Sequence, residues 1–549
     1  MSLLRLNSNE GPRASRALLT ELAELDPELL RRYPDAAAVE AALAARVGVS
    51  EDRILVTAGA DEALDRIYRA YAGPDRPVLL PEPTFDMLEH FAALVSAPLV
   101  RVPWLTDAFP LDAILSRLDD RIAIVVVVSP NNPTGGVASR DDVRRIAAAA
   151  PRSLLLIDQA YIEYADEDID RGLLDLPNVV VARTMSKAWG LAGCRVGYAI
   201  GSADVIAVLR AAGAPYPVAG PSLALALSQL RRGDAAVRDH VAQVRAERVE
   251  LRQLLCARGV DARVSQANFV FADFGRRAAF VRDGLSAQGI LVRDFPGRAG
   301  LETSLRITLP GDPADFERLS RALDTVLAPD AIVFDLDGVL ADVRESQRAA
   351  MLATAASFGV TVTMGDIEAA LRAGDAANDW IVTQRLIGVC GVAVDLASVT
   401  ARYQSLYLGT NGTPGLRERE RSIVPRALLE RLATRLPLAV VTGRPRDEAR
   451  WFLEREGLAG CFRAVVCMED APRKPDPAPV RLALARLGVR AAWMVGNTPD
   501  DIRAAAGASV IPFGVVAPGD DLAATSAALT EAGAVRVLNQ VIDLEELLS

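Results

Sequence analysis

Short apolar runs that alternate with helical stretches limit the folds open to this chain more than any other feature of its sequence. Within the first 330 residues, five such runs are rich in β-branched residues or leucine, and stretches rich in Ala, Arg and Leu lie between several of them. A strand that is apolar on both faces is typical of a parallel sheet covered by helices. We therefore expect an α/β fold, with strands at Ile54–Thr57, Val78–Leu80, Ile122–Val128, Leu154–Ile157 and Val179–Ala182.

The alternation stops near residue 220 and begins again after residue 330. Between these points we expect a long helix at Ala224–Arg258 and two short strands near residues 269 and 305. A closing helix is expected at Asp315–Leu327. The second alternation follows a short linker, residues 328–330, and is interrupted by a helical stretch from about 345 to 433. Its strands are expected to begin at Ala331 and to lie at Leu438–Thr442, Ala464–Val466 and Ala492–Gly496.

The composition excludes several classes of function. A net charge of −10 argues against nucleic acid as the main partner, and the longest aliphatic run is too short to span a bilayer. The N-terminus lacks a basic segment followed by an apolar one, so no secretory signal is expected. Five scattered cysteines without a C-x-x-C pair indicate a reducing compartment, which we expect to be the cytoplasm, and no zinc–thiolate site. With two histidines in 549 residues, a histidine-based triad is not expected.

Lysine is almost absent from this chain. Only two of the 61 Lys and Arg residues are lysines, Lys187 and Lys474. Arginine cannot lose its proton to become an amine nucleophile, and its planar group differs from the compact charge of an ammonium. Both lysines are therefore candidates for chemistry that arginine cannot perform.

Four polar motifs follow predicted strands in the first half of the chain. T-M-S-K ends with Lys187, D-Q-A-Y runs from Asp158 to Tyr161, and Ser129–Gly136 and Thr57–Glu62 follow two further strands. Ligands of open α/β sheets bind at such carboxyl ends of strands, and the start of a helix offers N–H groups to a phosphate. A lysine that forms a Schiff base and an aspartate that pairs with a pyridinium nitrogen suit pyridoxal phosphate.

Further motifs accompany these in a fixed order. They are L-N-S-N-E-G-P at 6–12, R-Y-P-D at 32–35, A-G-A-D-E at 58–62, P-T-F at 83–85, S-P-N-N-P-T-G at 129–135, D-Q-A-Y at 158–161, S-K-A-W-G-L-A-G-C-R at 186–195, V-R-D at 292–294 and L-R-I-T at 305–308. With them, residues 1–328 resemble a fold-type I aminotransferase, most of all the histidinol-phosphate aminotransferases.

The resemblance implies a role for each matching residue. Lys187 would be the Schiff-base lysine and proton shuttle, and Asp158 would pair with the ring nitrogen. Asn132 and Tyr161 would bind the ring's phenolic oxygen, while Phe85 would stack on the ring. The cofactor phosphate would be surrounded by Ala60, Asp61, Thr184, Ser186 and Arg195.

The same resemblance implies a homodimer and a substrate site. Tyr33 would reach the phosphate of the partner subunit's cofactor. Arg306 would hold the amino donor's carboxylate and, with Arg293, the substrate phosphate. Gly11 and Gln159 replace the family's usual Asn and Glu, and neither change removes chemistry.

A second set of motifs lies after residue 330. Asp335 and Asp337 end a strand and share a side of it, because side chains alternate. One such carboxylate can attack phosphorus while the other protonates the leaving oxygen. Thr442 follows a second strand, Lys474 lies in R-K-P-D-P, and an acidic turn follows Val495.

In this order the four pieces resemble the haloacid dehalogenase-like hydrolases over residues 330–549. The resemblance implies that Asp335 is the nucleophile, that Asp337 is the general acid and base, and that Thr442 and Lys474 bind the phosphoryl group. The family usually carries G-D-x-x-x-D in its fourth motif, where this chain has Asn497 in place of the first aspartate. The implied Mg²⁺ ligands are Asp335, Asp337, Asn497 and Asp501.

The sequence thus predicts a bifunctional enzyme. A pyridoxal-phosphate aminotransferase, residues 1–328, has a small α+β subdomain (about 1–30 and 225–328) and a large α/β subdomain (about 31–224). A Rossmann-like phosphatase, residues 329–549, has a helical cap at about 345–433. Two reactions of histidine biosynthesis are predicted. The first is transamination, which interconverts histidinol phosphate and 2-oxoglutarate with imidazole acetol phosphate and glutamate. The second is Mg²⁺-dependent removal of the phosphate from histidinol phosphate. Alternatives are another phospho-amino substrate, a decarboxylase resembling threonine-phosphate decarboxylase, or a second domain that only senses a phosphometabolite.

Overall fold

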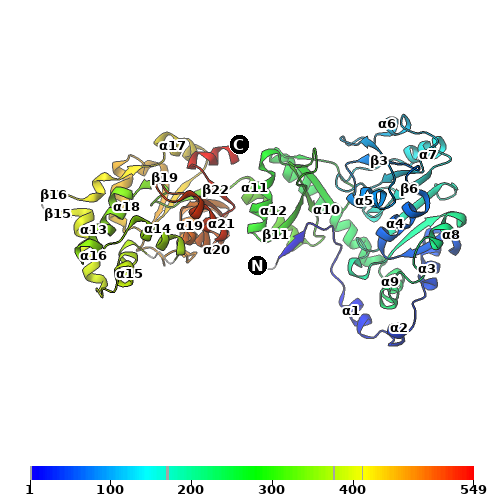
Figure 1. Ribbon diagram of the computed structural model, residues 1–549, viewed down its shortest axis with the longest axis horizontal. Helices are drawn as coiled ribbons and strands as arrows, with labels where there is room; N and C mark the ends of the chain where they lie inside the picture. The colour runs from blue at the N-terminus through cyan, green and yellow to red at the C-terminus, as the bar shows by residue number, and fades with distance from the viewer. Residues whose placement is uncertain (1–2, 169–171, 375–377, 411, 549) are drawn as a thin grey trace. The chain divides into compact units, whose positions relative to one another are not determined.

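The computed structural model describes residues 3–168, 172–374, 378–410 and 412–548. The chain divides into two compact units (Figure 1). Of the described residues, the first holds those up to 278 and those from 291 to 320, and the second holds those from 279 to 290 and those after 320. The domain boundaries given above stay a prediction. Across the described residues, no helix is both long and apolar enough to cross a membrane.

The first unit is built on a seven-stranded sheet with the order β2-β8-β7-β6-β5-β3-β4. All five strands expected in this region are confirmed, while β4 and β8 were not predicted. Only β8 runs antiparallel to its neighbours, so the other strands present their carboxyl ends at one edge. The strands are β2 Ile54–Thr57, β3 Val78–Glu82, β4 Leu99–Pro103, β5 Ile124–Val128, β6 Leu154–Asp158, β7 Val179–Thr184 and β8 Gly197–Gly201.

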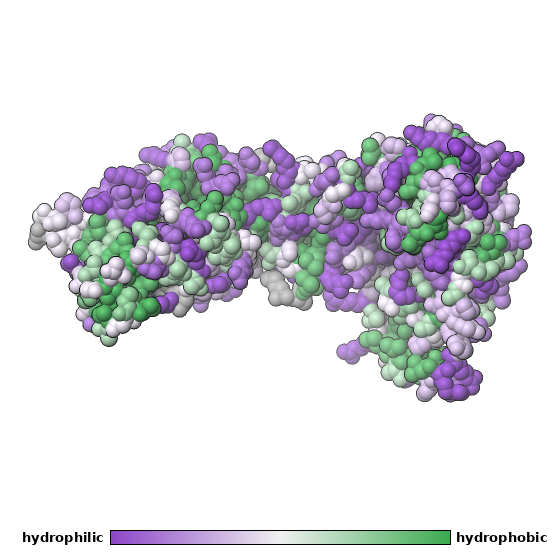
Figure 2. All heavy atoms as spheres, viewed as in Figure 1, coloured by the Kyte–Doolittle hydropathy of each residue, from purple (hydrophilic) through white to green (hydrophobic). Residues whose placement is uncertain are grey.

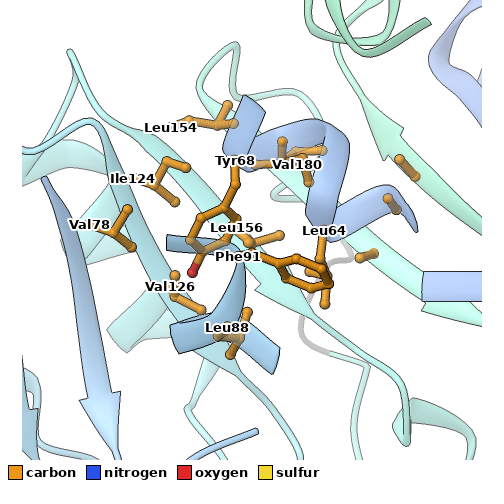
Figure 3. Packing of buried hydrophobic residues seen from close by; sticks show 14 of the residues in the cluster. Leu64, Tyr68, Val78, Leu88, Phe91, Ile124, Val126, Leu154, Leu156 and Val180 are labelled. Atoms are coloured by element: carbon orange, nitrogen blue, oxygen red, sulfur yellow. The ribbon is translucent and has the colours of Figure 1, made fainter. Parts of the chain in front are cut away.

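Helices α4 (Gly59–Tyr71) and α5 (Asp86–Leu94) bury an apolar face against this sheet. In α4, buried residues recur three and four positions apart, as an amphipathic helix requires. Figure 3 shows Leu64 and Tyr68 of α4 and Phe91 of α5 packed over Leu156 of β6. This core fixes the start of α4 against the strand ends where the predicted site lies.

A smaller sheet has the order β1-β11-β12-β10-β9. Two helices, α9 and α10, come before its strands β9 to β12 in the chain. The single helix expected over 224–258 is wrong, because α9 ends and α10 begins around Gly233. The sheet's strands are β1 Leu4–Leu6, β9 Asp261–Ala262, β10 Phe269–Asp273, β11 Ile290–Asp294 and β12 Ser304–Thr308. The remaining helices up to residue 327 are α1 Arg16–Ala23, α2 Glu28–Arg31, α3 Ala37–Val47, α6 Leu111–Leu115, α7 Arg140–Ala149, α8 Ala203–Ala211, α9 Gly220–Arg232, α10 Asp234–Ala257, α11 Ala278–Ala287 and α12 Pro313–Leu327.

The second unit is built on a six-stranded parallel sheet with the order β19-β18-β13-β20-β21-β22. Four of these strands were predicted and two, β21 and β22, were not. Phe280 of α11 packs edge-on against Trp493 of β20, 5.4 Å between ring centroids, so α11 completes this unit's core. The strands are β13 Ala331–Phe334, β18 Leu438–Val441, β19 Phe462–Val466, β20 Ala492–Gly496, β21 Ile511–Val515 and β22 Arg536–Leu538.

In its described residues, the stretch from 345 to 433 is mainly helical, as predicted, and also carries three two-residue strands, β15, β16 and β17. Its first four helices share the apolar contacts of Met351, Ile367, Val382 and Tyr403. The helices of this unit are α13 Ala349–Ser357, α14 Met364–Ala373, α15 Asp379–Val389, α16 Leu396–Leu408, α17 Arg426–Arg435, α18 Arg446–Arg455, α19 Ala478–Leu487, α20 Pro499–Gly507, α21 Leu522–Glu531 and α22 Leu544–Leu547. The short strands in this stretch are β15 Gly409–Thr410, β16 Thr413–Pro414 and β17 Arg421–Ser422, and β14 Ala341–Asp342 lies just before it.

Candidate active sites

A cavity of about 320 Å³ lies at the carboxyl ends of β5, β6 and β7 in the first unit. It brings together almost every residue predicted for the cofactor and its substrate. These are Ala60, Asp61, Phe85, Asn132, Asp158, Tyr161, Thr184, Ser186, Lys187, Arg195, Arg293 and Arg306. Tyr33 is the exception, because it is 82% exposed and stacks on Tyr216 outside the cavity.

Asp158 and Lys187 are an acidic and a basic residue of opposite predicted roles in this cavity. Asp158 is the last residue of β6, and its Oδ1 accepts a hydrogen bond from the N–H of Ala160 at 3.0 Å. Burial raises the pKa of Asp158 to about 7. Such a carboxyl is stabilised by a cationic partner, and a protonated ring nitrogen is one. The Nζ of Lys187 lies 5.6 Å from the ring centroid of Tyr161, on the same wall.

Asn9 is a cavity residue that received no role from the sequence. Its Nδ2 donates to the Tyr161 hydroxyl at 2.9 Å, and its Oδ1 accepts from the Thr308 hydroxyl at 2.8 Å. The residue is buried and has a positive φ of 54°, a conformation that Asn tolerates better than most residues. Asn9 therefore fixes the Tyr161 hydroxyl, and the L-N-S-N-E motif was the signal for it.

The predicted phosphate cup lies where α4 begins. Arg195 contacts Asp61 at 2.9 Å and donates to the Ser186 hydroxyl at 3.3 Å. Gly59 has φ +81°, and a Cβ there would lie 2.6 Å from the Arg195 guanidinium. Glycine thus leaves room between the first N–H groups of the helix and a basic side chain, which is the arrangement that binds a phosphate.

Two arginines line the substrate side of the cavity. Arg293 and Arg306 are paired across β11 and β12, so their side chains share a face of the sheet. Arg306 is buried, which lowers its pKa, and it donates to Asn132 Oδ1 at 2.5 Å and to the Asn7 carbonyl at 2.8 Å. Two adjacent guanidinium groups suit a carboxylate or phosphate.

The structure explains why glycine occupies position 11. A Cβ on Gly11 would overlap the main-chain oxygen of Lys187. The family's usual Asn therefore does not fit this backbone, and the change from it preserves the position of the lysine.

A second cavity, of about 150 Å³, lies at the carboxyl ends of β13, β18 and β20 in the second unit. Asp335, Asp337, Thr442, Lys474 and Asn497 all line it, whereas Asp501 does not. The cap helices contribute the opposite wall, because residues of α13 to α16 line the same cavity.

Lys474 links two carboxylates at the base of this cavity. Its Nζ donates to Asp335 Oδ1 at 2.7 Å and also contacts Asp501 Oδ1. Burial lowers the pKa of Lys474, but the two carboxylates outweigh burial and raise it above its ordinary value. Burial raises the pKa of Asp335, and Lys474 opposes that rise. The ammonium thereby favours the ionised form of Asp335.

Arg444 and Glu420 form a buried pair that the sequence analysis did not assign. Arg444 Nε donates to Asp337 Oδ1 at 2.7 Å, and its Nη1 donates to Glu420 Oε2 at 2.9 Å. Glu420 also accepts hydrogen bonds from the hydroxyls of Tyr407 and Ser346. This chain of contacts fixes the orientation of the Asp337 carboxylate.

The fourth motif divides its polar groups between two tasks. Asp501 Oδ2 accepts from the N–H groups of Asn497 and Thr498 at the start of α20. The side chain of Asn497 lines the cavity, and its buried Oδ1 has no hydrogen-bond partner among the described residues. Across those residues, no group of three or more His, Cys, Asp or Glu side chains is placed to hold a metal. The amide oxygen beside Asp335 and Asp337 nevertheless gives the hard oxygen donors that Mg²⁺ prefers.

Comparison with known families agrees with the geometry of both cavities. Residues 2–323, more than half of the chain, match the family model of class I and II aminotransferases. The chain belongs to the class I and II aminotransferase family. Residues 329–509 match the model of haloacid dehalogenase-like hydrolases, so the aminotransferase is joined to a hydrolase domain. The predicted fold class and both enzyme classes are confirmed.

Individual proteins of known name and structure are also similar to parts of this chain. The aminotransferase is 37% identical over 334 residues to histidinol-phosphate aminotransferase of Chlorobium phaeovibrioides, covering 59% of this chain and 91% of that protein. A stretch of 219 residues of this chain, 38% of its length, is 43% identical to imidazoleglycerol-phosphate dehydratase of Phytophthora nicotianae and covers about half, 48%, of that protein. Histidinol-phosphate aminotransferase of Sinorhizobium meliloti, solved in complex with pyridoxal-5′-phosphate, superposes with a TM-score of 0.54 at 27% identity, over 59% of this chain and 90% of that one.

Proposed function

We propose that this chain catalyses two consecutive steps of histidine biosynthesis. The first cavity transfers the amino group of glutamate to imidazole acetol phosphate, which gives histidinol phosphate and 2-oxoglutarate. The second cavity hydrolyses histidinol phosphate to histidinol and phosphate. The observation that carries the proposal is the cavity holding Lys187, Asp158 and the Arg293–Arg306 pair in a chain so similar to histidinol-phosphate aminotransferases.

The residues of the first cavity fit pyridoxal phosphate. When bound, this group supplies an aldehyde carbon that bonds to amines and a ring that withdraws electrons. The Nζ of Lys187 would hold it and move the proton, and the Asp158 carboxylate would keep a proton on the ring nitrogen. Tyr161, held by Asn9, would donate its hydroxyl to the ring oxygen.

The phosphate of the same group would lie in the cup at the start of α4. Ser186 and Arg195 supply donors there besides the N–H groups of the helix. Since Arg306 is buried and fixed by Asn132 and Asn7, we assign it the amino donor's carboxylate. Arg293, exposed at the same wall, takes the substrate phosphate with it.

The aminotransferase site is proposed to be completed by a second subunit. Tyr33 and Leu30 are more than four-fifths exposed, and Leu19 and Leu22 are also exposed nearby in the sequence. Hydrophobic side chains gather over α1, α2 and α9 in Figure 2. An exposed apolar patch of this kind marks an interface, and Tyr33 of one subunit would then enter the site of the other. A sedimentation mass of a single chain would contradict this arrangement.

In the second cavity, the chemistry follows from the two aspartates. An oxygen of Asp335 attacks phosphorus and forms an aspartyl phosphate, while Asp337 gives a proton to the leaving alcohol oxygen. Asp337 then takes a proton from the water that releases phosphate and restores Asp335. Thr442 and Lys474 bind the phosphoryl oxygens. Mg²⁺ would be held by Asp335, the backbone of Asp337 and Asn497, and it would neutralise phosphoryl charge; Asp501 positions Lys474.

Replacing Asn497 with Asp tests that set of metal ligands. A carboxylate adds a negative charge at the position of the unpartnered amide oxygen, so tighter binding of the cation is expected. The Mg²⁺ concentration that gives half-maximal phosphate release should fall by about tenfold. Asn539→Asp, which changes the same charge on an exposed loop, should leave it unchanged. An unchanged or higher Mg²⁺ requirement in Asn497→Asp would exclude this residue as a ligand.

The whole function is tested with the purified full chain, imidazole acetol phosphate, glutamate, pyridoxal phosphate and Mg²⁺. Histidinol and free phosphate should form, with 2-oxoglutarate equal in amount to histidinol. Accumulation of histidinol phosphate without phosphate release would refute the second step. Absence of 2-oxoglutarate would refute the first.

A further inference from the structure

Among the carboxyl groups that line the second cavity, Asp379 and Glu448 have no role in the proposed hydrolysis. Asp379 is the first residue of α15 in the cap, and Glu448 lies in the first turn of α18. Both line the cavity that holds Asp335 and Asp337. They therefore face the space beside the phosphoryl site rather than solvent alone.

Within the described part of the chain, the hydrogen bonds to these two carboxyls come from neutral side chains. The Tyr403 hydroxyl donates to Asp379 Oδ2 at 2.7 Å, and Gln404 Nε2 donates to Glu448 Oε1 at 2.9 Å. Among the described residues, no basic side chain forms a hydrogen bond or ion pair with either. Burial, assisted by Asp337, raises the pKa of Asp379 to about 6, and burial raises that of Glu448 to about 7.

The basic residues that line the cavity are engaged elsewhere. Lys474 contacts Asp335 and Asp501, Arg444 contacts Asp337 and Glu420, and Arg348 is ion-paired with Asp520. Arg473, the remaining one, is exposed. The cavity thus keeps one carboxyl on the cap helix α15 and one on α18 that no basic side chain of the described residues contacts directly, and a bound cation would stabilise both.

The same cavity shows an independent sign that it takes a ligand. Asn497 is 8% exposed, and its Oδ1 is unpartnered within the described part of the chain while the side chain lines the cavity. Trp380, next to Asp379, and Met351 give the cavity an apolar wall, against which an organic cation can pack. The residues assigned to the phosphoryl group and the metal therefore line the same cavity as Asp379 and Glu448.

We propose that Asp379 and Glu448 form an anionic subsite that selects phosphate monoesters carrying a protonated amine or imidazolium group. The phosphate of such an ester lies against Asp335, Thr442 and Lys474, while its cationic end lies between the two carboxyls. The inference rests on the proposed hydrolase function, and it deepens that function by assigning the substrate class to two residues. It applies to any cationic phosphate ester, so it does not depend on histidinol phosphate being the natural one.

The test compares 3-aminopropyl phosphate with propyl phosphate, a pair that differs in one ammonium group. With the full chain and Mg²⁺, kcat/KM should be higher for the amino ester. In Asp379→Asn and Glu448→Gln, which keep size, the ratio of the two kcat/KM values should fall by roughly ten- to a hundredfold, the scale of a hydrogen bond to a charged group. Glu454→Gln removes a charge from the exposed face of the same α18 and should keep the wild-type ratio.

Each result decides for or against the subsite. A wild-type chain without preference for the amino ester, or variants that keep the preference, would overturn it. Variants that change only the Mg²⁺ requirement would assign the carboxyls to a metal site instead. If the chain prefers the amino ester but leaves histidinol phosphate intact, the subsite stands and the proposed substrate fails. If no ester is hydrolysed, calorimetric binding of the two esters to Asp379→Asn and Glu454→Gln replaces turnover, and equal binding in both variants would refute the subsite.

Discussion

Lys187→Ala is expected to abolish transamination while phosphate release continues. The other lysine, Lys474, contacts Asp335 and Asp501 in the second unit, so no amine in the described part of the first cavity can replace Lys187. Loss of an amine that both holds the cofactor and moves a proton should lower the rate at least about a thousandfold. The variant should also lose the visible absorption band of the bound cofactor. The measurements are the absorption spectrum and 2-oxoglutarate formation.

Lys187→Arg is the matched control for charge. It keeps a positive group near Tyr161 and Asp158 but cannot serve as an amine nucleophile. Inactivity of both variants would indicate that the amine itself is needed, whereas activity retained in Lys187→Arg would show that a positive charge is sufficient. Near wild-type transamination by Lys187→Ala would remove the cofactor assignment altogether.

The fold was predictable wherever burial alone determines a strand. β5 and β6 are apolar on both faces, so their sequences leave no other place for them than the middle of a sheet. β8, which begins and ends with glycine, and β21, which contains Pro512 and Gly514, lack the composition of strands. β8 and β21 form because neighbouring strands supply hydrogen-bond partners for their backbones. Those neighbours lie elsewhere in the chain, so the local sequence does not reveal the two strands. The break at Gly233 was missed because helical periodicity continues on both sides of it.

The site residues that were predicted lie in short sequence motifs, many of them at strand ends, whereas Glu420, Asp379 and Glu448 were missed because they act through long-range contacts. Glu420 has no motif around it, yet its contacts with Arg444, Tyr407 and Ser346 join segments up to 74 residues apart. Asp379 and Glu448 likewise share a cavity only after the cap folds over the sheet. Sequence patterns record local geometry and the order of motifs, whereas the pairing of single charged residues depends on tertiary packing.

Asp335→Asn is expected to abolish phosphate release and to leave transamination intact. An amide keeps the size of the side chain but is a poor nucleophile, and it no longer offers a carboxylate to the Lys474 ammonium at 2.7 Å. The turnover number should fall by at least about 10⁴-fold, which is the order of magnitude expected when an enzyme loses its nucleophile. The measurement is release of phosphate from histidinol phosphate, alongside 2-oxoglutarate formation in the same preparation.

A trapping experiment separates a nucleophile from a residue that merely binds phosphate. Rapid acid quenching of the wild-type chain during turnover, followed by peptide mass spectrometry, should place a phosphoryl group on Asp335. Asp337→Asn should slow turnover, because no group then moves the proton, but it should leave Asp335 as the phosphorylated residue. Lys474 still donates to Asp335 in that variant, so the ion pair that favours the ionised form of Asp335 is kept. A phosphoryl group found on another residue would refute the assignment of Asp335, because the reaction would then pass through a different bond to phosphorus.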